Sequence, residues 1–307
     1  MKTALRVNQL KKAYGQHQAV KQISFEVQAG GCYGLLGPNG AGKSTTMKIV
    51  SCILKPDRGT VEVFGRDAVK QTSEVRKMIG YVPQNITLYD KLSAYDNLLF
   101  FGEMFGLKGL SLKKRIQDVL EQVGLSDRAK DAVHTFSGGM ARRINIAASL
   151  LHQPKLLILD EPTVGIDPQS RNHIFEMIRQ LNRDGVTVIY STHYMEEVET
   201  LCDQLAIIDH GNVIAEGSLQ ALLSRYGTKS VYIESAGQLD IPVSSFKEPS
   251  SRSGAGWIIQ TDNTVSTIRE VSELCLKQSV PVQRLEIVRP SLETVFLTLT
   301  GTSLRNS

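Results

Sequence analysis

The clearest chemical pattern is a glycine-rich loop near the start of the chain. It satisfies GxxxxGK[ST] in full with Gly37, Pro38, Asn39, Gly40, Ala41, Gly42, Lys43, Ser44 and Thr45. Backbone N–H groups of such a loop wrap a phosphate, and glycine permits the close approach. Lys43 would neutralise β- and γ-phosphate oxygens, and Ser44 would ligate Mg²⁺. The alternative is a turn with an ordinary surface lysine. The strand-like residues before the loop and the helix-like residues after it disfavour that alternative.

A pair of carboxylates forms the second part of the pattern. Asp160 and Glu161 directly follow four aliphatic residues, Leu156–Leu159, which predict a strand buried on both faces of a parallel sheet. Burying two adjacent carboxylates is costly without a cation, and Mg²⁺ supplies one. Asp160 would hold the metal through its water shell, and Glu161 would act as general base toward an attacking water. A strand that simply exits into solvent is the alternative, and the phosphate loop makes it less favoured. The two motifs together indicate a nucleotide hydrolase.

A third motif lies shortly before the acidic strand end. Residues 136–140 read Phe-Ser-Gly-Gly-Met and resemble the LSGGQ signature of the ABC ATPases. Other residues match that family in the same order over about residues 5–217: Tyr14 as the adenine-stacking aromatic, Gln84 as the Q-loop glutamine, Asp160 and Glu161 as the acidic strand end, Gly165, Ile166 and Asp167 as the D-loop, and His193 as the switch histidine. Each of Tyr14, Gln84 and His193 alone has an ordinary structural explanation, but the ordered series favours function.

The resemblance implies an ATPase that uses ATP and Mg²⁺. It implies catalytic roles for Lys43, Gln84, Glu161 and His193, and metal contacts from Ser44, Gln84 and Asp160. It implies nucleotide contacts from Tyr14, the loop 37–45, Ser137, Gly138, Gly139 and Asp167. In the family the signature serves ATP bound on a second subunit, so we expect a head-to-tail homo- or heterodimer closed by ATP. Met140 departs from the family's glutamine, which removes one polar contact across that interface.

The C-terminal sequence points to one branch of the family. Residues 289–297 read RPSLETVFL and look like the PSLEDVFL element of the multidrug and daunorubicin-type exporter ATPases, which pair with separate membrane subunits. An amphipathic helix on its own small domain explains the same residues. We expect the permease subunit to contact the surface near the Q-loop. The candidates are Tyr81, Leu88, Tyr89 and Leu92, for which burial in the core is an equal alternative.

Strand-like and helix-like segments alternate along the chain and predict an α/β fold. The resemblance specifies a P-loop NTPase of ABC type, with a mostly parallel core sheet, an antiparallel β subdomain and a helical subdomain. We expect the ATPase domain over residues 1–225, with its helical subdomain at about 88–152. A small α+β accessory domain in ββαβα order is expected over 226–307. The Ser- and Gly-rich residues 250–256 predict a loop within it.

Composition narrows the possible functions. The net charge is +4 with no concentrated block of either sign, so no nucleic-acid binding is expected. The longest apolar patch, Leu98–Leu107, is far short of the ~20 residues of a membrane span. The resemblance then implies a cytoplasmic chain that is held at the cell membrane by a polytopic permease. Two alternatives stay open: an ABC ATPase acting on ribosomes or DNA, and a nucleotide-binding module without turnover, which Glu161 and His193 argue against.

Overall fold

The computed structural model describes residues 2–227, 229–236 and 250–300. Two compact units are present, one running to Leu219 and the other beginning at Gln220. Within the described residues, no helix is long and apolar enough to cross a membrane.

The first unit is built on a ten-stranded sheet with the order β5-β4-β1-β2-β10-β9-β3-β8-β7-β6. Its strands are β1 (Thr3–Tyr14), β2 (His17–Gln28), β3 (Cys32–Leu36), β4 (Arg58–Val63), β5 (Arg66–Asp67), β6 (Ile79–Val82), β7 (Leu156–Asp160), β8 (Thr187–Thr192), β9 (Gln204–Asp209) and β10 (Asn212–Ser218). The run β9-β3-β8-β7-β6 is parallel, whereas β5, β4, β1 and β2 pair antiparallel. The predicted parallel core with an antiparallel part is confirmed.

The parallel strands are buried because helices cover them. Every residue of β3, β7 and β8 is buried, as continuous apolar runs predict. The helices of this unit are α1 (Lys43–Val50), α2 (Thr72–Met78), α3 (Ala94–Met104), α4 (Gly109–Gln122), α5 (Gly138–Leu150), α6 (Pro168–Arg183) and α7 (Met195–Leu201), with short 3₁₀ turns at Ser126–Arg128 and Val133–Thr135.

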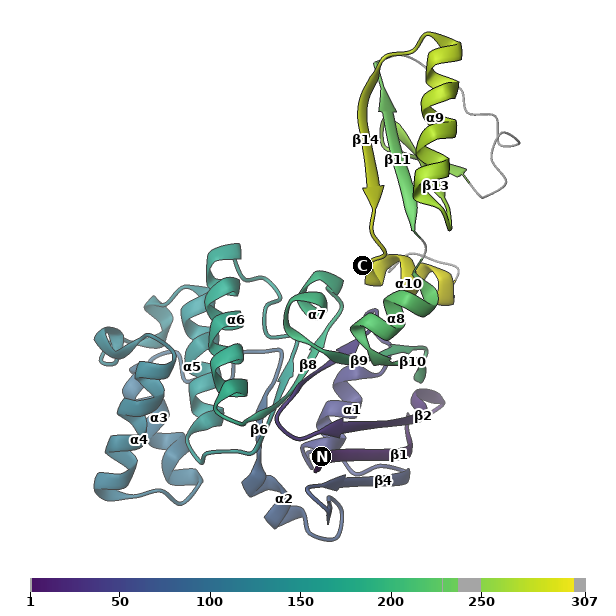
Figure 1. The fold of residues 1–307 in the computed structure, drawn as a ribbon. Coiled ribbons are helices and arrows are strands. Elements are labelled where there is room, and N and C mark those ends of the chain that lie inside the picture. The colour runs from purple at the N-terminus through teal and green to yellow at the C-terminus, as the bar shows by residue number, and fades with distance from the viewer. Residues whose placement is uncertain (1, 228, 237–249, 301–307) are drawn as a thin grey trace. The chain divides into compact units, whose positions relative to one another are not determined.

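Helices α3, α4 and α5 form a group of their own beside the sheet. Figure 1 shows them together, away from the antiparallel strands β1, β2 and β4. Helix α4 turns one apolar face inward, with Leu112, Ile116, Val119 and Leu120 buried. Ser93 caps α3 by accepting a hydrogen bond from the backbone N–H of Asp96. The sequence predicts a helical part at about residues 88–152, and these three helices lie within that range.

The second unit contains a four-stranded sheet with the order β12-β13-β11-β14. Its elements are α8 (Leu219–Tyr226), β11 (Ser230–Ser235), β12 (Ser250–Ser253), β13 (Gly256–Gln260), α9 (Thr264–Gln278), β14 (Val282–Val288) and α10 (Leu292–Thr300). Val271 and Cys275 of α9 pack on Ile233 and Ile259 of the sheet. The loop prediction for residues 250–256 is wrong, because β12 pairs with β13 across a tight turn where Gly254 has a positive φ of 57°.

The fold makes a specific demand at Gly80 of β6. A Cβ there would lie 2.6 Å from the carbonyl oxygen of Ser149 and 3.1 Å from Leu157 Cδ1, so β6 could not stay against α5 and β7. We expect Gly80→Ala to lower the free energy of unfolding by about 1–3 kcal/mol, as overpacking does. Denaturant unfolding measures the change. Gly31→Ala is the control, since the nearest atom to its added Cβ is 4.0 Å away; equal stability of the two variants would contradict this packing.

Candidate nucleotide site

Four adjacent parallel strands end at the same edge of the sheet and carry the polar residues that the sequence singles out. Strand β3 leads into the loop 37–45, β8 into His193, β7 into Glu161 and β6 into Gln84. The registers align these ends, because Leu36 pairs with Thr192 and Asp160 with Ser191. Ligands of open α/β sheets bind beyond the carboxyl ends of the strands. The sequence motifs therefore meet at a position suited to a ligand.

A cavity of about 460 Å³ lies at this edge. It is lined by Tyr14, His17, Ala19, Asn39, Gly40, Gly42, Lys43, Ser44, Thr45, Gln84 and Glu161. Sequence reasoning missed His17 and Ala19. His17 reaches the cavity because it pairs with Tyr14 across a tight β1–β2 turn.

The phosphate loop approaches its neighbours so closely that glycine is required. A Cβ on Gly37 would lie 2.1 Å from the carbonyl oxygen of Ile208, and one on Gly42, at a φ of 105°, would lie 2.5 Å from that of Ala19. Gly37, Pro38 and Ala41 complete the loop but are not among the residues lining the cavity. Helix α1 begins directly after Gly42, so its N-terminal N–H groups face the site.

Lys43 is held at the centre of the loop. Its ammonium donates to the carbonyl oxygens of Gly37 at 2.8 Å and Pro38 at 3.1 Å. It also lies 3.1 Å from Glu161 Oε1, and both side chains are almost fully buried. Burial lowers the pKa of Lys43, and the Glu161 carboxylate opposes that shift. The contact joins the phosphate loop to the acidic end of β7.

Asp160 faces the first turn of α1. Ser44 Oγ donates to Asp160 Oδ1 at 3.0 Å, and the Tyr81 hydroxyl donates to Oδ2 at 3.3 Å. Burial raises the pKa of Asp160, and the hydrogen bond from Ser44 opposes this shift. Tyr81 was expected as a candidate for permease contact, but it is half-buried against the core and bonded to Asp160. Tyr81 therefore belongs to the candidate site, and the sequence of β6 did not predict its contact with Asp160.

Glu161 brings together the other two residues expected to be catalytic. Gln84 Nε2 donates to Glu161 Oε2 at 3.3 Å, and His193 Nδ1 lies 3.3 Å from Oε1. The backbone of Glu161 has a positive φ of 48°, which non-glycine residues seldom adopt, and its N–H donates to the carbonyl of Ser191 at 3.0 Å. Such conformations cluster at functional sites, where the surrounding structure holds them.

The signature and D-loop residues lie together, apart from this cavity. Ser137 caps α5, and Asp167 caps α6 by accepting from the backbone N–H of Ser170 at 2.9 Å. A Cβ on Gly139 would lie 2.3 Å from Ser170 Oγ, so the two helix N-termini are in contact. Ser137, Gly138, Gly139 and Asp167 are absent from the described lining of the cavity.

Known proteins resemble this chain over most of its length. Residues 20–164 match the family model described as ABC transporter. The linearmycin resistance ATP-binding protein LnrL of Bacillus subtilis is 45% identical over 98% of this chain and 100% of its own length. The daunorubicin/doxorubicin resistance ATP-binding protein DrrA of Streptomyces peucetius is 35% identical over 97% of this chain and 92% of its own.

A solved structure shows the same fold. It is the dimeric post-hydrolysis state of the ATP-binding cassette MJ0796 bound to ADP and Pi, which is 26% identical with a TM-score of 0.63. The match covers 70% of this chain and 98% of that structure. The resemblance of the sequence motifs, the strand-end site and the full-length relatives agree, and the chain belongs to the ATP-binding proteins of ABC transporters, which are ATPases.

Proposed function

We propose that this chain hydrolyses ATP at the strand-end cavity and powers export through a separate membrane permease, on whose cytoplasmic side it sits. One observation carries the proposal: Lys43, Gln84 and His193 all reach the Glu161 carboxylate beside the phosphate loop. Export is supported by relatives named for linearmycin and daunorubicin/doxorubicin resistance. These names suggest an antibiotic-like cargo, which the permease would select.

The site also fits Mg²⁺. This ion prefers oxygen ligands and commonly combines one or two carboxylates with substrate phosphates. Ser44 Oγ and Asp160 Oδ1 lie 3.0 Å apart at the start of α1, and the buried Asp160 carboxylate gains from a cation nearby. Ser44 would ligate the ion, Asp160 would hold it through water, and Gln84 would complete the polar shell. When bound, Mg²⁺ neutralises charge on the β- and γ-phosphate oxygens.

The protein groups divide the reaction between them. Lys43 holds the phosphates, while Glu161 accepts a proton from the attacking water. His193, which directly follows β8, would donate a hydrogen bond to the γ-phosphate and would thereby sense whether that phosphate is bound. Tyr14, which is half-exposed at the mouth of the cavity, offers its ring to the adenine.

The position of the signature supports a head-to-tail dimer. Ser137 and Gly138 are exposed at the N-terminus of α5, and in one chain they do not line that chain's own cavity. A helix N-terminus attracts anions, so this surface would bind the γ-phosphate held by a second copy or a related subunit. ATP would then lie between two chains and favour the closed dimer.

Substitution of Glu161 tests the catalytic assignment. Glu161→Gln keeps the size of the side chain but cannot accept the proton, so turnover should fall about 10²–10⁴-fold while Mg·ATP still binds. Phosphate release and nucleotide titration measure the two effects, and gel filtration with ATP should show a trapped dimer. Glu121→Gln, exposed on α4, is the matched control. Undiminished turnover in Glu161→Gln would remove the general base from the proposal.

An exposed apolar patch near the Q-loop supports a docking surface for the permease. Tyr89 and Leu92, which the sequence analysis names as candidates for permease contact, are 51% and 40% exposed. Ile86, which is near Tyr89 in the sequence, and Phe100, whose ring contacts that of Tyr89, are also exposed. The rings of Tyr89 and Phe100 meet edge to face with centroids 5.1 Å apart. Leu88 is half-buried. Exposed apolar side chains that gather in this way mark interaction sites.

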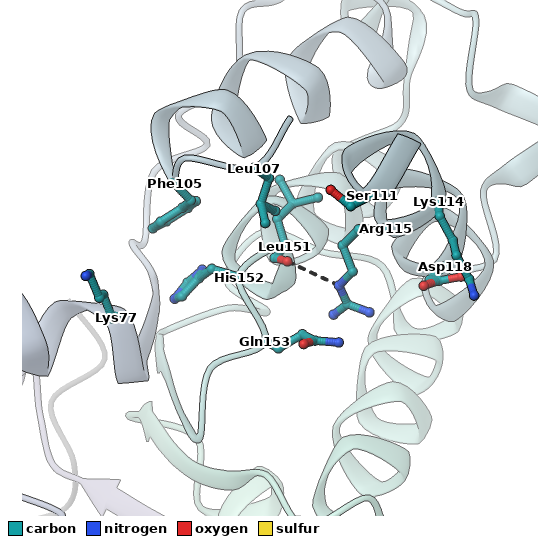
Figure 2. Close-up of a pocket in the computed structure, with 10 residues that line it drawn as sticks. All are labelled: Lys77, Phe105, Leu107, Ser111, Lys114, Arg115, Asp118, Leu151, His152 and Gln153. Carbon is teal, nitrogen blue, oxygen red and sulfur yellow. Dashed lines mark hydrogen bonds between the residues drawn. The ribbon is translucent and has the colours of Figure 1, made fainter. Parts of the chain in front are cut away.

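A second cavity lies at the far end of α3. It has a volume of about 650 Å³, and Figure 2 shows the residues that line it: Lys77, Phe105, Leu107, Ser111, Lys114, Arg115, Asp118, Leu151, His152 and Gln153. Phe105 stacks on His152 with ring centroids 3.9 Å apart. Arg115 donates to the carbonyl oxygens of Leu150 and Leu151. Lys77, Lys114 and Arg115 outnumber Asp118, so the cavity suits a permease segment that carries acidic and apolar side chains.

Charge reversal at the second cavity tests whether the cavity is a docking surface for the permease. Lys114→Glu would place a like charge against an acidic partner, so recovery of the permease should fall about tenfold or more. The measurement is an affinity pull-down from detergent-solubilised membranes with quantification of polytopic membrane proteins. Lys113→Glu changes the neighbouring exposed lysine that does not line the cavity, and it should leave recovery intact. Equal recovery with both variants would exclude this surface, and ribosomes or DNA in place of a permease would favour the non-transport alternative.

A further inference from the structure

A third buried carboxylate, after Asp160 and Glu161, belongs to helix α7. Glu197 of α7 is only 2% exposed. Its Oε1 accepts a hydrogen bond from Thr163 Oγ1 at 2.6 Å, and its Oε2 accepts from Thr192 Oγ1 at 2.8 Å and from the Tyr190 hydroxyl at 3.0 Å. Arg171 Nε of α6 lies 3.7 Å from Oε1. All three hydroxyl donors belong to buried residues.

Through its partners, Glu197 connects the segment that contains Glu161 to the segment that contains His193. Thr192 directly precedes His193, and its Oγ1 also accepts a hydrogen bond from the backbone N–H of Tyr194 at 2.9 Å. The Thr192 hydroxyl therefore bonds to the residue on the other side of His193. Thr163 follows Glu161 by two residues, and its carbonyl accepts from the N–H of Ile166 in the D-loop at 3.1 Å. One carboxylate thus bonds to the segments that carry the general base and the switch histidine.

Burying a carboxylate costs several kcal/mol unless its oxygens are well paired, and an apolar residue at the same place is often no less stable. Here the oxygens are paired, and the pairs connect α7 to the end of β8 and to the loop that follows β7. Satisfied buried networks rigidify the groups that they join. The network is therefore suited to fixing loop geometry at the site.

We propose that Glu197 is a positioning residue for hydrolysis: through Thr192 and Thr163 it sets His193 and the D-loop relative to Glu161. Glu197 is not among the residues that line the cavity. The inference rests on the proposed role of His193 in hydrolysis. Glu196, its neighbour on α7, is exposed and does not share these contacts.

Three variants test the proposal. Glu197→Gln keeps the shape but places an amide N–H₂ against hydroxyl donors, so kcat should fall about 10- to 100-fold, as loss of supporting partners does. The dissociation constant for Mg·ATP should stay within about twofold, because the cavity residues keep their contacts. Glu196→Gln is the matched control and should change neither. Thr192→Val, which removes one hydroxyl, repeats the test should Glu197→Gln fail to fold.

A double variant separates positioning from general stability. If Glu197 acts through His193, then Glu197→Gln should cause little further loss of kcat in a His193→Ala background. Full multiplication of the two losses, a parallel weakening of Mg·ATP binding, or a kcat within twofold of the unsubstituted chain would overturn the proposal. The outcomes distinguish failure of the proposed role of His193 from failure of the positioning role of Glu197. Unchanged turnover in His193→Ala alone refutes the proposed role of the histidine, whereas loss there without loss in Glu197→Gln refutes only the positioning role.

Discussion

The buried ion pair between Lys43 and Glu161 is the interaction on which the rest of the site depends. The exposed fractions of Lys43, Asp160 and Glu161 are 4%, 2% and 4%, so three ionisable groups share one small and largely buried region. Such burial is tolerable only when the charges meet one another or a cation. The strand order β3-β8-β7 brings the ammonium and the carboxylates to the same edge, and the side chain of Glu161, whose backbone has a positive φ, reaches Lys43 of the loop.

Much of this arrangement could be predicted from the sequence because the motifs lie at strand ends. Continuous apolar runs identify β3, β7 and β8, and parallel strands deliver their carboxyl ends to one place. What the sequence could not show is which neighbouring side chains turn inward. Tyr81 has its hydroxyl on Asp160 because β6 pairs with β7, and its sequence neighbours carry no sign of that register. Glu196 and Glu197 are identical in type, and only the packing of α7 buries the second.

The second unit illustrates a different limit. Residues 250–253 read Ser-Ser-Arg-Ser, which has none of the β-branched or aromatic character that favours strands. They nevertheless pair with β13, because the turn at Gly254 places them beside a strand that already has partners. Tertiary pairing thus overrides local preference. The first helix of the expected ββαβα order is α9, which buries Thr267, Val271 and Cys275, and the last two pack on the sheet.

Helix α5 connects the proposed docking surface to the signature, which precedes its first residue, and to the segment that contains Gln84. Its first residue follows the capping Ser137 of the signature, while Arg142 donates to the backbone carbonyls of Pro83 and Gln84 and Asn145 accepts from Thr87. The carbonyls of Leu150 and Leu151, at its other end, hold Arg115 beside the second cavity. A rigid helix with partners at both ends transmits displacement along its length. On the proposed function, a permease segment seated near Arg115 or Tyr89 would shift the signature and Gln84 together, and would couple closure around ATP to the state of the membrane subunit.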